Sequence, residues 1–383
     1  MWVGEWVGRP SLGWVITTLA VHGYRSLRDV VLPLAPITVV TGANGVGKSS
    51  LYQAFRLMAG IAEGQLIGAL ARAGGLSSVL WAGPERISRQ MRSGEHAVQG
   101  TRRQGPVSLM LGYAADELGY LVDVGLPQPR TTLFVRDPLI KREEIFAGPV
   151  LRPGSRLVSR PRELPGRASL LDEPVDADTL PEISRVRRTL RSWRFYDSFR
   201  VDADAPARAP QVGTHTPVLA HDGRDLPGAL ATIADGPRAG ELDRLIADAF
   251  DGARVEVAEQ DGLFSVRWQQ PGLLRPMSAA ELSDGTLRYL LLATALLAER
   301  PPSLLVVNEP ETSLHPALVP ALARLVVAAA GRSQVVVVTH SSALTDDLEQ
   351  AGAMRHELVK RVGETEVDGQ GLLTRPAWEW GRR

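Results

Sequence analysis

Strand-like and helix-like patterns follow one another near the N-terminus. Residues 15–21 and 37–41 are short runs rich in β-branched residues, and each predicts a strand. Leu51, Phe55 and Met58 then recur at the spacing of one helix face. This part of the chain therefore predicts strands followed by a helix, with a glycine-rich segment before the helix.

The C-terminal part alternates regularly between helices and strands. We predict helices over 286–298 and 317–330, and strands over 304–307 and 335–338. Both strands are continuous hydrophobic runs, which is typical of strands buried on both faces of a parallel sheet. Helices that alternate with such strands indicate an α/β fold.

The middle of the chain carries weaker patterns. Hairpins are predicted around Asp116-Glu117 and around Asp261-Gly262, and helices over 226–234 and 242–250. Residues 126–182 are rich in Pro, Gly and Arg and show little periodicity. We predict an irregular insertion or lid there.

Composition excludes several classes of protein. The net charge is zero, so the whole chain is not a polycation that seeks nucleic acid. It has no cysteine, which excludes disulfides and thiol catalysis and fits a cytoplasmic protein. We expect no signal peptide, no coiled-coil arm and no membrane-spanning segment. The only lysines are Lys48, Lys141 and Lys360, so Lys48 is kept where the chain otherwise uses arginine.

A glycine-rich loop lies between the predicted strand 37–41 and the helix. It matches the pattern GxxxxGK[ST] as Gly42-Ala43-Asn44-Gly45-Val46-Gly47-Lys48-Ser49. Glycines let backbone N–H groups curl around phosphates, and the helix N-terminus adds partial positive charge. We expect Lys48 to reach the β- and γ-phosphates and Ser49 to bind Mg²⁺, with Ser50 as a further nucleotide contact.

The polar pair Asn308-Glu309 ends the predicted strand 304–307. Glu309 can accept a proton from an attacking water and so act as a general base. Asn308 can offer an oxygen to a Mg²⁺-bound water but brings no negative charge. We therefore expect weakened metal binding and slow hydrolysis.

Other polar segments surround this pair in the sequence. Ser283-Asp284-Gly285 precedes the predicted helix 286–298, where a hydroxyl and backbone N–H groups can meet an anion. Ser313-Leu314-His315 follows Glu309 closely, and His340 ends the next strand. A neutral imidazole there could contact a γ-phosphate.

The order of these motifs resembles that of ABC-type ATPases: Walker A, Ser-x-Gly signature, Walker B, a short loop and then a histidine. Three segments narrow the resemblance to the SMC/RecF/OLD-like AAA-family ATPases of bacteria and phages, in particular short members without a coiled coil or a Toprim domain. These segments are Gly23-Tyr24-Arg25-Ser26-Leu27, LSDGTLR at 282–288 and NEPETSLHP at 308–316. The motif blocks cover residues 14–60 and 277–345.

The resemblance implies a single bipartite ABC head over residues 1–383, with an antiparallel β lobe beside a RecA-like α/β lobe. An N-terminal lobe would span 14–125, an insertion or lid 126–240 and a C-terminal lobe 241–383. Two heads would sandwich ATP and Mg²⁺ as a homodimer. Ser283, Asp284 and Gly285 of one head would then approach the phosphates bound by the other.

The resemblance also implies residue roles. Glu309 would activate water, His340 would be the switch residue, and Ser313, Leu314 and His315 would form the D-loop. Arg25 and Ser26 match a segment near the phosphates, and Ser49 and Asn308 would serve the metal. The contacts of the nucleotide would include Asn44, Gly45, Val46, Gly47, Lys48, Ser49 and Ser50. Gln90, Gln99 and Gln104 are open alternatives for the Q-loop glutamine.

Three functions compete. The first is an ATPase that acts on DNA in repair or phage defence, supported by two arginine clusters of which the second includes Trp193, Phe195 and Tyr196. The second is an ATP-gated switch for a partner nuclease or toxin. The third, a transporter subunit, is disfavoured because Asp284 replaces the second glycine common in transporter signatures. The clusters are Arg86, Arg89, Arg92, Arg102 and Arg103, then Arg185, Arg187, Arg188, Arg191, Arg194 and Arg200.

Overall fold

The computed structural model describes residues 15–85, 87–88, 90–91, 108–127, 134–152, 154–172, 180–371 and 373–381. These residues form two compact units. We call the first the signature unit; it contains Pro36–Val39 and Arg194–Arg355. We call the second the P-loop unit; it contains Gly13–Ala35, Val40–Trp193 and His356–Arg383.

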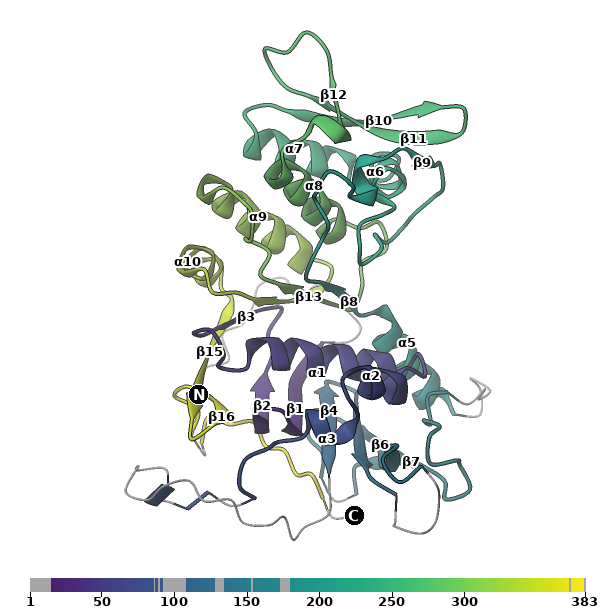
Figure 1. Cartoon of the computed structure of the whole chain (residues 1–383), viewed down its shortest axis with the longest axis vertical. Helices are drawn as coiled ribbons and strands as arrows, with labels where there is room; N and C mark the ends of the chain where they lie inside the picture. The colour runs from purple at the N-terminus through teal and green to yellow at the C-terminus, as the bar shows by residue number, and fades with distance from the viewer. Residues whose placement is uncertain are drawn as a thin grey trace. The chain divides into compact units, whose positions relative to one another are not determined.

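The P-loop unit is built on an antiparallel sheet in the order β2-β1-β4-β5-β6-β7 (Figure 1). Its strands are β1 (Ile16–Tyr24), β2 (Leu27–Pro33), β4 (Leu109–Ala115), β5 (Leu118–Gly125), β6 (Leu139–Ala147) and β7 (Arg156–Ser159). The strand predicted over 15–21 and the hairpin around Asp116-Glu117 are confirmed. This sheet is the antiparallel β lobe that the resemblance implied.

The prediction of an irregular segment over 126–182 is wrong where β6 and β7 form. The strand β6 escapes detection because it carries the polar run Lys141-Arg142-Glu143-Glu144. Glu143 is fully buried, and its carboxylate accepts hydrogen bonds from the hydroxyls of Tyr120 and Ser169, both at 2.5 Å. Burial raises the pKa of Glu143. A glutamate predicts a surface position from sequence, but this one belongs to the core, where hydrogen bonds satisfy its carboxylate.

Helices and a second hairpin complete the P-loop unit. The helices are α1 (Lys48–Ile61), α2 (Leu66–Arg72), α3 (Leu76–Val79) and α5 (Pro181–Ser192), and the hairpin strands are β15 (Met354–Arg361) and β16 (Glu364–Val367). Trp193 joins α1 to the sheet, with its ring centroid 6.1 Å from that of Phe55 and 5.7 Å from that of Tyr113. This aromatic residue of the second arginine cluster therefore belongs to the core.

The signature unit contains three adjacent parallel strands in the order β14-β13-β8, with β3 (Ile37–Thr41) next to β14. The strands are β8 (Arg194–Tyr196), β13 (Leu304–Asn308) and β14 (Gln334–Val338). All residues of β14 are buried, as its continuous hydrophobic run predicted. The α/β architecture predicted from the C-terminal pattern is confirmed.

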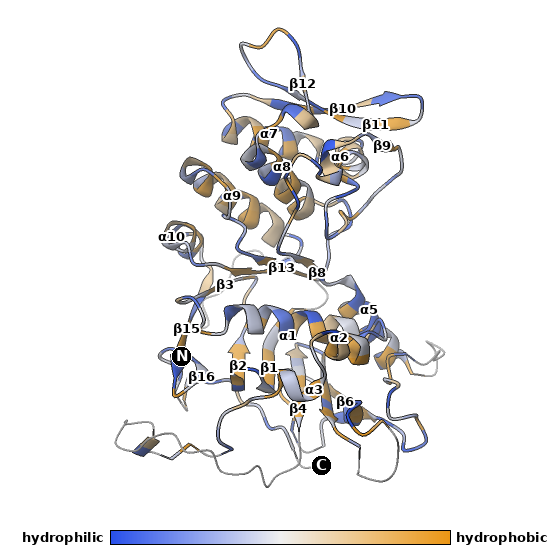
Figure 2. Ribbon diagram, in the orientation of Figure 1, coloured by the Kyte–Doolittle hydropathy of each residue, from blue (hydrophilic) through white to orange (hydrophobic). Residues whose placement is uncertain are grey.

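The helices and 3₁₀ turns of the signature unit enclose one hydrophobic core that includes Trp268, Tyr289 and Leu290. Figure 2 shows hydrophobic residues along β13 and on the helices α8 and α9. These elements are η1 (Pro206–Arg208), α6 (Leu226–Ala234), α7 (Ala239–Ala249), η2 (Ala279–Glu281), α8 (Asp284–Leu296), η3 (Pro316–Leu318), α9 (Val319–Ala330) and α10 (Ser342–Gln350).

A small antiparallel sheet contributes Trp268 to this core. It consists of β9 (Gln211–Val212), β10 (Arg254–Gln260), β11 (Leu263–Gln269) and β12 (Met277–Ser278). The hairpin predicted around Asp261-Gly262 is confirmed as β10 and β11. Within the described part of the chain, no helix is both long and apolar enough to cross a membrane.

Candidate functional site

The glycine-rich loop of the P-loop unit has the backbone shape that its glycines allow. Gly42, Gly45 and Gly47 have φ values of 141°, 78° and 114°, which favour glycine. Gly47 also precedes the first residue of α1, and no side chain caps this helix end. The N–H groups at the start of α1 are therefore available to an anion.

Lys48 turns back over the same loop. Its Nζ donates to the carbonyl oxygen of Gly42 at 2.5 Å and to that of Ala43 at 3.1 Å. Lys48 is 6% exposed, while Ser49 is exposed in the first turn of α1 and Ser50 is buried. An ammonium group has three donors, so Lys48 has the chemistry to bind a phosphate at this loop.

Thr365 and Lys360, which the sequence did not mark as site residues, contact this loop. The Thr365 hydroxyl lies 2.6 Å from the carbonyl oxygen of Val46 and 2.8 Å from the Ser26 hydroxyl. A Cβ on Gly47 would lie only 2.3 Å from Thr365 Oγ1, and Lys360 Nζ donates to the Gly45 carbonyl at 3.3 Å. No local pattern marks Thr365, because it follows Val46 by 319 positions.

Of the predicted pair Arg25-Ser26, Ser26 adjoins this loop in the P-loop unit. Arg25 is exposed and has a positive φ of 49°. Its N–H donates to Val79 at 2.7 Å, and its guanidinium stacks over the Tyr24 ring. Ser26 reaches the back of Gly47, with its Oγ 3.0 Å from a Cβ built there. The structure thus brings Ser26 together with the phosphate loop.

The candidate base lies in the signature unit, directly after β13. Asn308 is the last residue of that strand, and Glu309 has a positive φ of 47°. The Glu309 N–H donates to the Val338 carbonyl at 2.7 Å, which ties the end of β13 to that of β14. His340 Nδ1 is 3.5 Å from Glu309 Oε1. Two candidate residues far apart in sequence therefore lie together.

A second carboxylate, Glu311, belongs to the same cluster and was not predicted. Its side chain is 9% exposed, and its Oε1 lies 3.6 Å from His340 Nδ1. The same oxygen accepts hydrogen bonds from the Thr339 hydroxyl at 2.5 Å and from the His340 N–H at 3.3 Å. The acidic run in 308–316 was the available signal, but the sequence could not show which acid faces the histidine.

The signature segment begins α8. Ser283 is the N-cap, and its Oγ accepts from the Thr286 N–H at 3.2 Å. A Cβ on Gly285 would lie 3.1 Å from the Ser313 carbonyl, so the signature and the predicted D-loop adjoin within one chain. Leu314 packs on the core, and His315 Nδ1 accepts from the Ala317 N–H at 3.2 Å.

Arg288, also on α8, links the signature helix to the candidate base. Its Nη2 donates to the Glu309 carbonyl at 3.1 Å, and the residue is 6% exposed. Burial lowers the pKa of Arg288, and the nearby carboxylates of Glu311, Asp197 and Glu309 oppose that shift. The backbone of Glu309 is therefore held by the same helix that presents Ser283.

The Q-loop candidates and the two arginine clusters are the remaining predicted residues. Gln99, Gln104 and the whole first arginine cluster lie outside the described residues, and Gln90 is exposed. In the second cluster, Trp193 and Tyr196 are 3% and 2% exposed. These rings pack inside the protein, so they are not stacking surfaces for nucleic-acid bases.

The chain is similar to one protein family and to a set of solved structures. The family model described as "AAA domain, putative AbiEii toxin, Type IV TA system" matches residues 37–346. No curated protein matches the chain. Solved structures of SMC head domains match it with low sequence identity.

An SMC head with a coiled coil and joint from Pyrococcus yayanosii is 12% identical, with a TM-score of 0.53 over 94% of this chain and 98% of that chain. An SMC head bound to the C-winged helix domain of ScpA is 15% identical, with a TM-score of 0.52 over 94% and 98%. The SMC head bound to the C-terminal domain of ScpA from Pyrococcus furiosus is 13% identical, with a TM-score of 0.50 over 94% and 97%.

These structures share the ABC-type P-loop fold, which confirms the fold and the resemblance inferred from the motif order. The family match spans both the glycine-rich loop and the Asn308-Glu309 strand end. The chain therefore belongs to this AAA-domain family, and its fold is that of an SMC/RecF-like ATPase head.

Proposed function

We propose that this chain binds ATP with Mg²⁺, hydrolyses ATP slowly and dimerises around the nucleotide. The observation that supports this most is the phosphate loop, where three glycines with positive φ precede Lys48 and an uncapped helix N-terminus. Lys48 and the N–H groups of this loop are the proposed phosphate contacts. Arg25, Ser26 and Ser50 are proposed as further contacts of the nucleotide.

Glu309 is the proposed general base. Its side chain is 39% exposed, so water can reach it, and His340 lies within 3.5 Å. Mg²⁺, when bound, neutralises phosphate charge and favours attack at phosphorus. Ser49 and Asn308 are each proposed as contacts of the metal or its water shell. Since Asn308 lacks a charge, we expect retention of the metal to be weak and turnover to be slow.

The signature segment supports the dimer. Ser283 and Asp284 are exposed at the start of α8, and an isologous interface would place each signature over the phosphates bound by the partner. In that arrangement Ser313, Leu314 and His315 would form the D-loop, and residues 126–240 would form the insertion of a single bipartite head.

The size of the particle with and without nucleotide tests this proposal. We expect a mass twice that of the monomer with Mg²⁺ and a non-hydrolysable ATP analogue, and reversal by ADP. Ser283→Arg is the matched control, because it blocks the interface with an exposed bulky group and should leave ATP binding to the monomer intact. A monomer at saturating nucleotide and micromolar protein contradicts the proposal.

For the target of the dimer we propose DNA, as in repair or phage defence. The support is the face of α5 that exposes Arg185, Arg188 and Arg191. Two local contacts weaken this support, because they occupy arginines that would otherwise face DNA. Arg185 pairs with Glu117 at 3.0 Å, and Arg191 Nε donates to the Ala62 carbonyl at 2.8 Å. The alternative is an ATP-gated switch that controls a partner nuclease or toxin.

DNA binding measured against salt concentration separates these targets. A DNA-binding dimer should lose affinity steeply with salt, and Arg185→Glu with Arg188→Glu should weaken binding. Arg224→Glu, a charge reversal of an exposed arginine paired with Asp222 in the signature unit, serves as the control. If the nucleotide-bound dimer does not bind DNA at low salt, the switch is favoured.

A further inference from the structure

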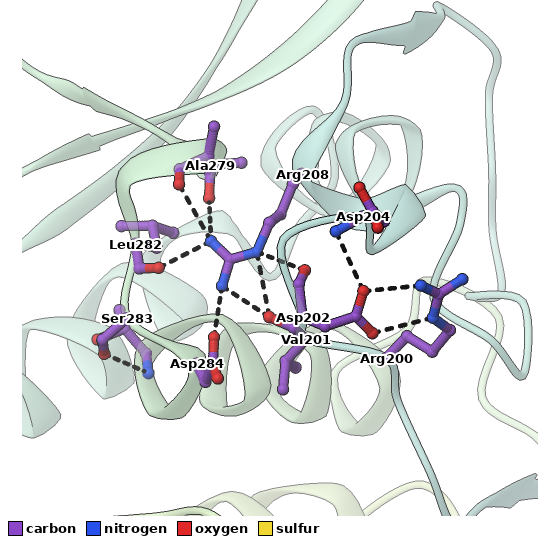
Figure 3. A network of polar contacts seen from close by, with 11 residues as sticks. Arg200, Val201, Asp202, Asp204, Arg208, Ala279, Leu282, Ser283 and Asp284 are labelled. Carbon is purple, nitrogen blue, oxygen red and sulfur yellow. Dashed lines mark hydrogen bonds and ion pairs between the residues drawn. The ribbon is translucent and has the colours of Figure 1, made fainter.

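Arg208 holds the backbone that leads into the signature segment. Its side chain is 8% exposed. Its Nη1 donates to the carbonyl oxygens of Leu282 at 2.8 Å, Ala279 at 2.9 Å and Ala280 at 3.3 Å. Figure 3 shows this guanidinium at the centre of the contacts. One side chain thus binds the backbone of η2 and of Leu282, directly before Ser283.

The same guanidinium is anchored on its own segment. Its Nε donates to the carbonyls of Val201 at 3.1 Å and Asp202 at 3.0 Å, and its Nη2 donates to Val201 at 2.7 Å. All three nitrogens therefore donate to backbone oxygens. Because the planar guanidinium presents its five N–H groups in a fixed fork, these contacts define one orientation of the side chain.

The remaining contact of Arg208 is to the signature itself. Nη2 donates to Asp284 Oδ1 at 2.7 Å, and the Asp284 side chain is 63% exposed. A carboxylate suits the N-terminus of a free helix. It is unfavourable where a phosphate must approach, because like charges brought together at an interface cost several kcal/mol.

We propose that Arg208 is a positioning residue that makes this signature compatible with the partner's ATP. It draws the Asp284 carboxylate to one side, neutralises it, and holds Ser283 and the N–H groups of α8 in place for the γ-phosphate. This inference rests on the proposed function, since it assigns Arg208 to the ATP-dependent dimer. Arg208 itself does not touch the phosphate.

Two roles of Arg208, the neutralisation of Asp284 and the support of the turn η2, can be separated with a single and a double variant. Arg208→Met keeps an unbranched apolar stem but removes the guanidinium with its charge and donors. We expect it to leave ATP binding to the monomer unchanged and to weaken dimerisation with a non-hydrolysable analogue at least about tenfold. Adding Asp284→Asn removes the uncompensated carboxylate and should restore part of that loss, while the turn before Ser283 stays released.

Arg275→Met is the matched control. Arg275 also pairs with a carboxylate beside the signature, at 2.7 Å from Glu281, but its side chain is 70% exposed. An exposed pair contributes little, so this variant should dimerise as the unchanged protein does. Wild-type dimerisation of Arg208→Met overturns the proposal. A loss that Asp284→Asn does not relieve also overturns it, because Arg208 would then act only as a scaffold.

Hydrogen exchange in the nucleotide-free monomer distinguishes this proposal from the proposed function. The Thr286 and Leu287 amides donate to Ser283 in the first turn of α8. Arg208→Met should speed their exchange at least about tenfold by releasing the turn before them, and Arg275→Met should not. If the unchanged protein never dimerises with nucleotide, the proposed function fails; unaltered exchange in Arg208→Met overturns the role of Arg208 separately.

Discussion

The Thr339 hydroxyl donates a 2.5 Å hydrogen bond to Glu311, whose side chain is 9% exposed. The bonded oxygen of Glu311 also lies 3.6 Å from His340 Nδ1. Thr339 and His340 directly follow β14, and Glu311 lies shortly after β13, so this contact links the segments that leave the two neighbouring strands. The candidate switch histidine is therefore oriented by a carboxylate as well as by its own backbone.

Thr339→Val should slow ATP turnover while ATP binding stays intact. Without the hydroxyl, Glu311 loses a partner and His340 loses its fixed orientation. A single hydrogen bond contributes about 1 kcal/mol, so we expect turnover to fall roughly fivefold. Thr339→Ser is the control, since it keeps the hydroxyl. Equal turnover in Thr339→Val and the unchanged protein would show that this contact does not act on His340.

Lys48→Ala and Glu309→Gln should separate binding from chemistry. Lys48 neutralises phosphate charge in the ground state, and its loss should lower nucleotide affinity at least about 100-fold. Glu309 is needed only when water is deprotonated, so Glu309→Gln should retain ATP and slow turnover about 100-fold or more. Nucleotide titration and phosphate release measure the two effects. Wild-type turnover by Glu309→Gln would remove Glu309 as the base.

Asn308→Asp should tighten Mg²⁺ binding and speed turnover, or else trap a stable dimer. A carboxylate accepts a hydrogen bond from the metal's water shell about twice as strongly as a neutral amide does. The added charge could instead repel the adjacent Glu309 carboxylate and impair the base, which would leave the ATP-bound dimer in place. Turnover measured against Mg²⁺ concentration distinguishes these results from no effect. Curves that superimpose would show that Asn308 does not serve the metal.

Acid should destabilise the P-loop unit through His356. Its Nε2 lies 2.8 Å from the Pro33 carbonyl, and burial lowers the pKa of His356 below the usual 6.5. Below about pH 6.5 the unfolded chain binds a proton that the folded chain does not, so stability falls as the pH drops toward the folded pKa.

His356→Gln isolates this effect, because an amide can donate to the Pro33 carbonyl without titrating. Thermal unfolding between pH 7.5 and 5.5 measures it. The melting temperature of the unchanged protein should fall more across this range than that of His356→Gln. Parallel curves would assign the acid sensitivity to other groups.

Local sequence was sufficient for the elements whose pattern and environment agree. The loop 42–49 follows a hydrophobic strand and opens a helix, and residues 335–338 of β14 are both apolar and buried. It was insufficient for β6, because the buried Glu143 looks like a surface residue until Tyr120 and Ser169 are placed beside it. It also could not show that Trp193 and Tyr196 pack inside rather than face a ligand.

By itself, the sequence determined the strand–loop–helix around Lys48, the order of the motifs and the α/β class, because backbone geometry and hydrophobic periodicity are local properties. Only the tertiary structure decided which distant side chains support those motifs. Thr365 lies behind the phosphate loop, Glu311 beside His340 and Arg208 against Asp284. Hydrogen bonds and ion pairs depend on distance in space. Folding brings these partners together although they are far apart in the sequence, and local periodicity does not predict such pairs.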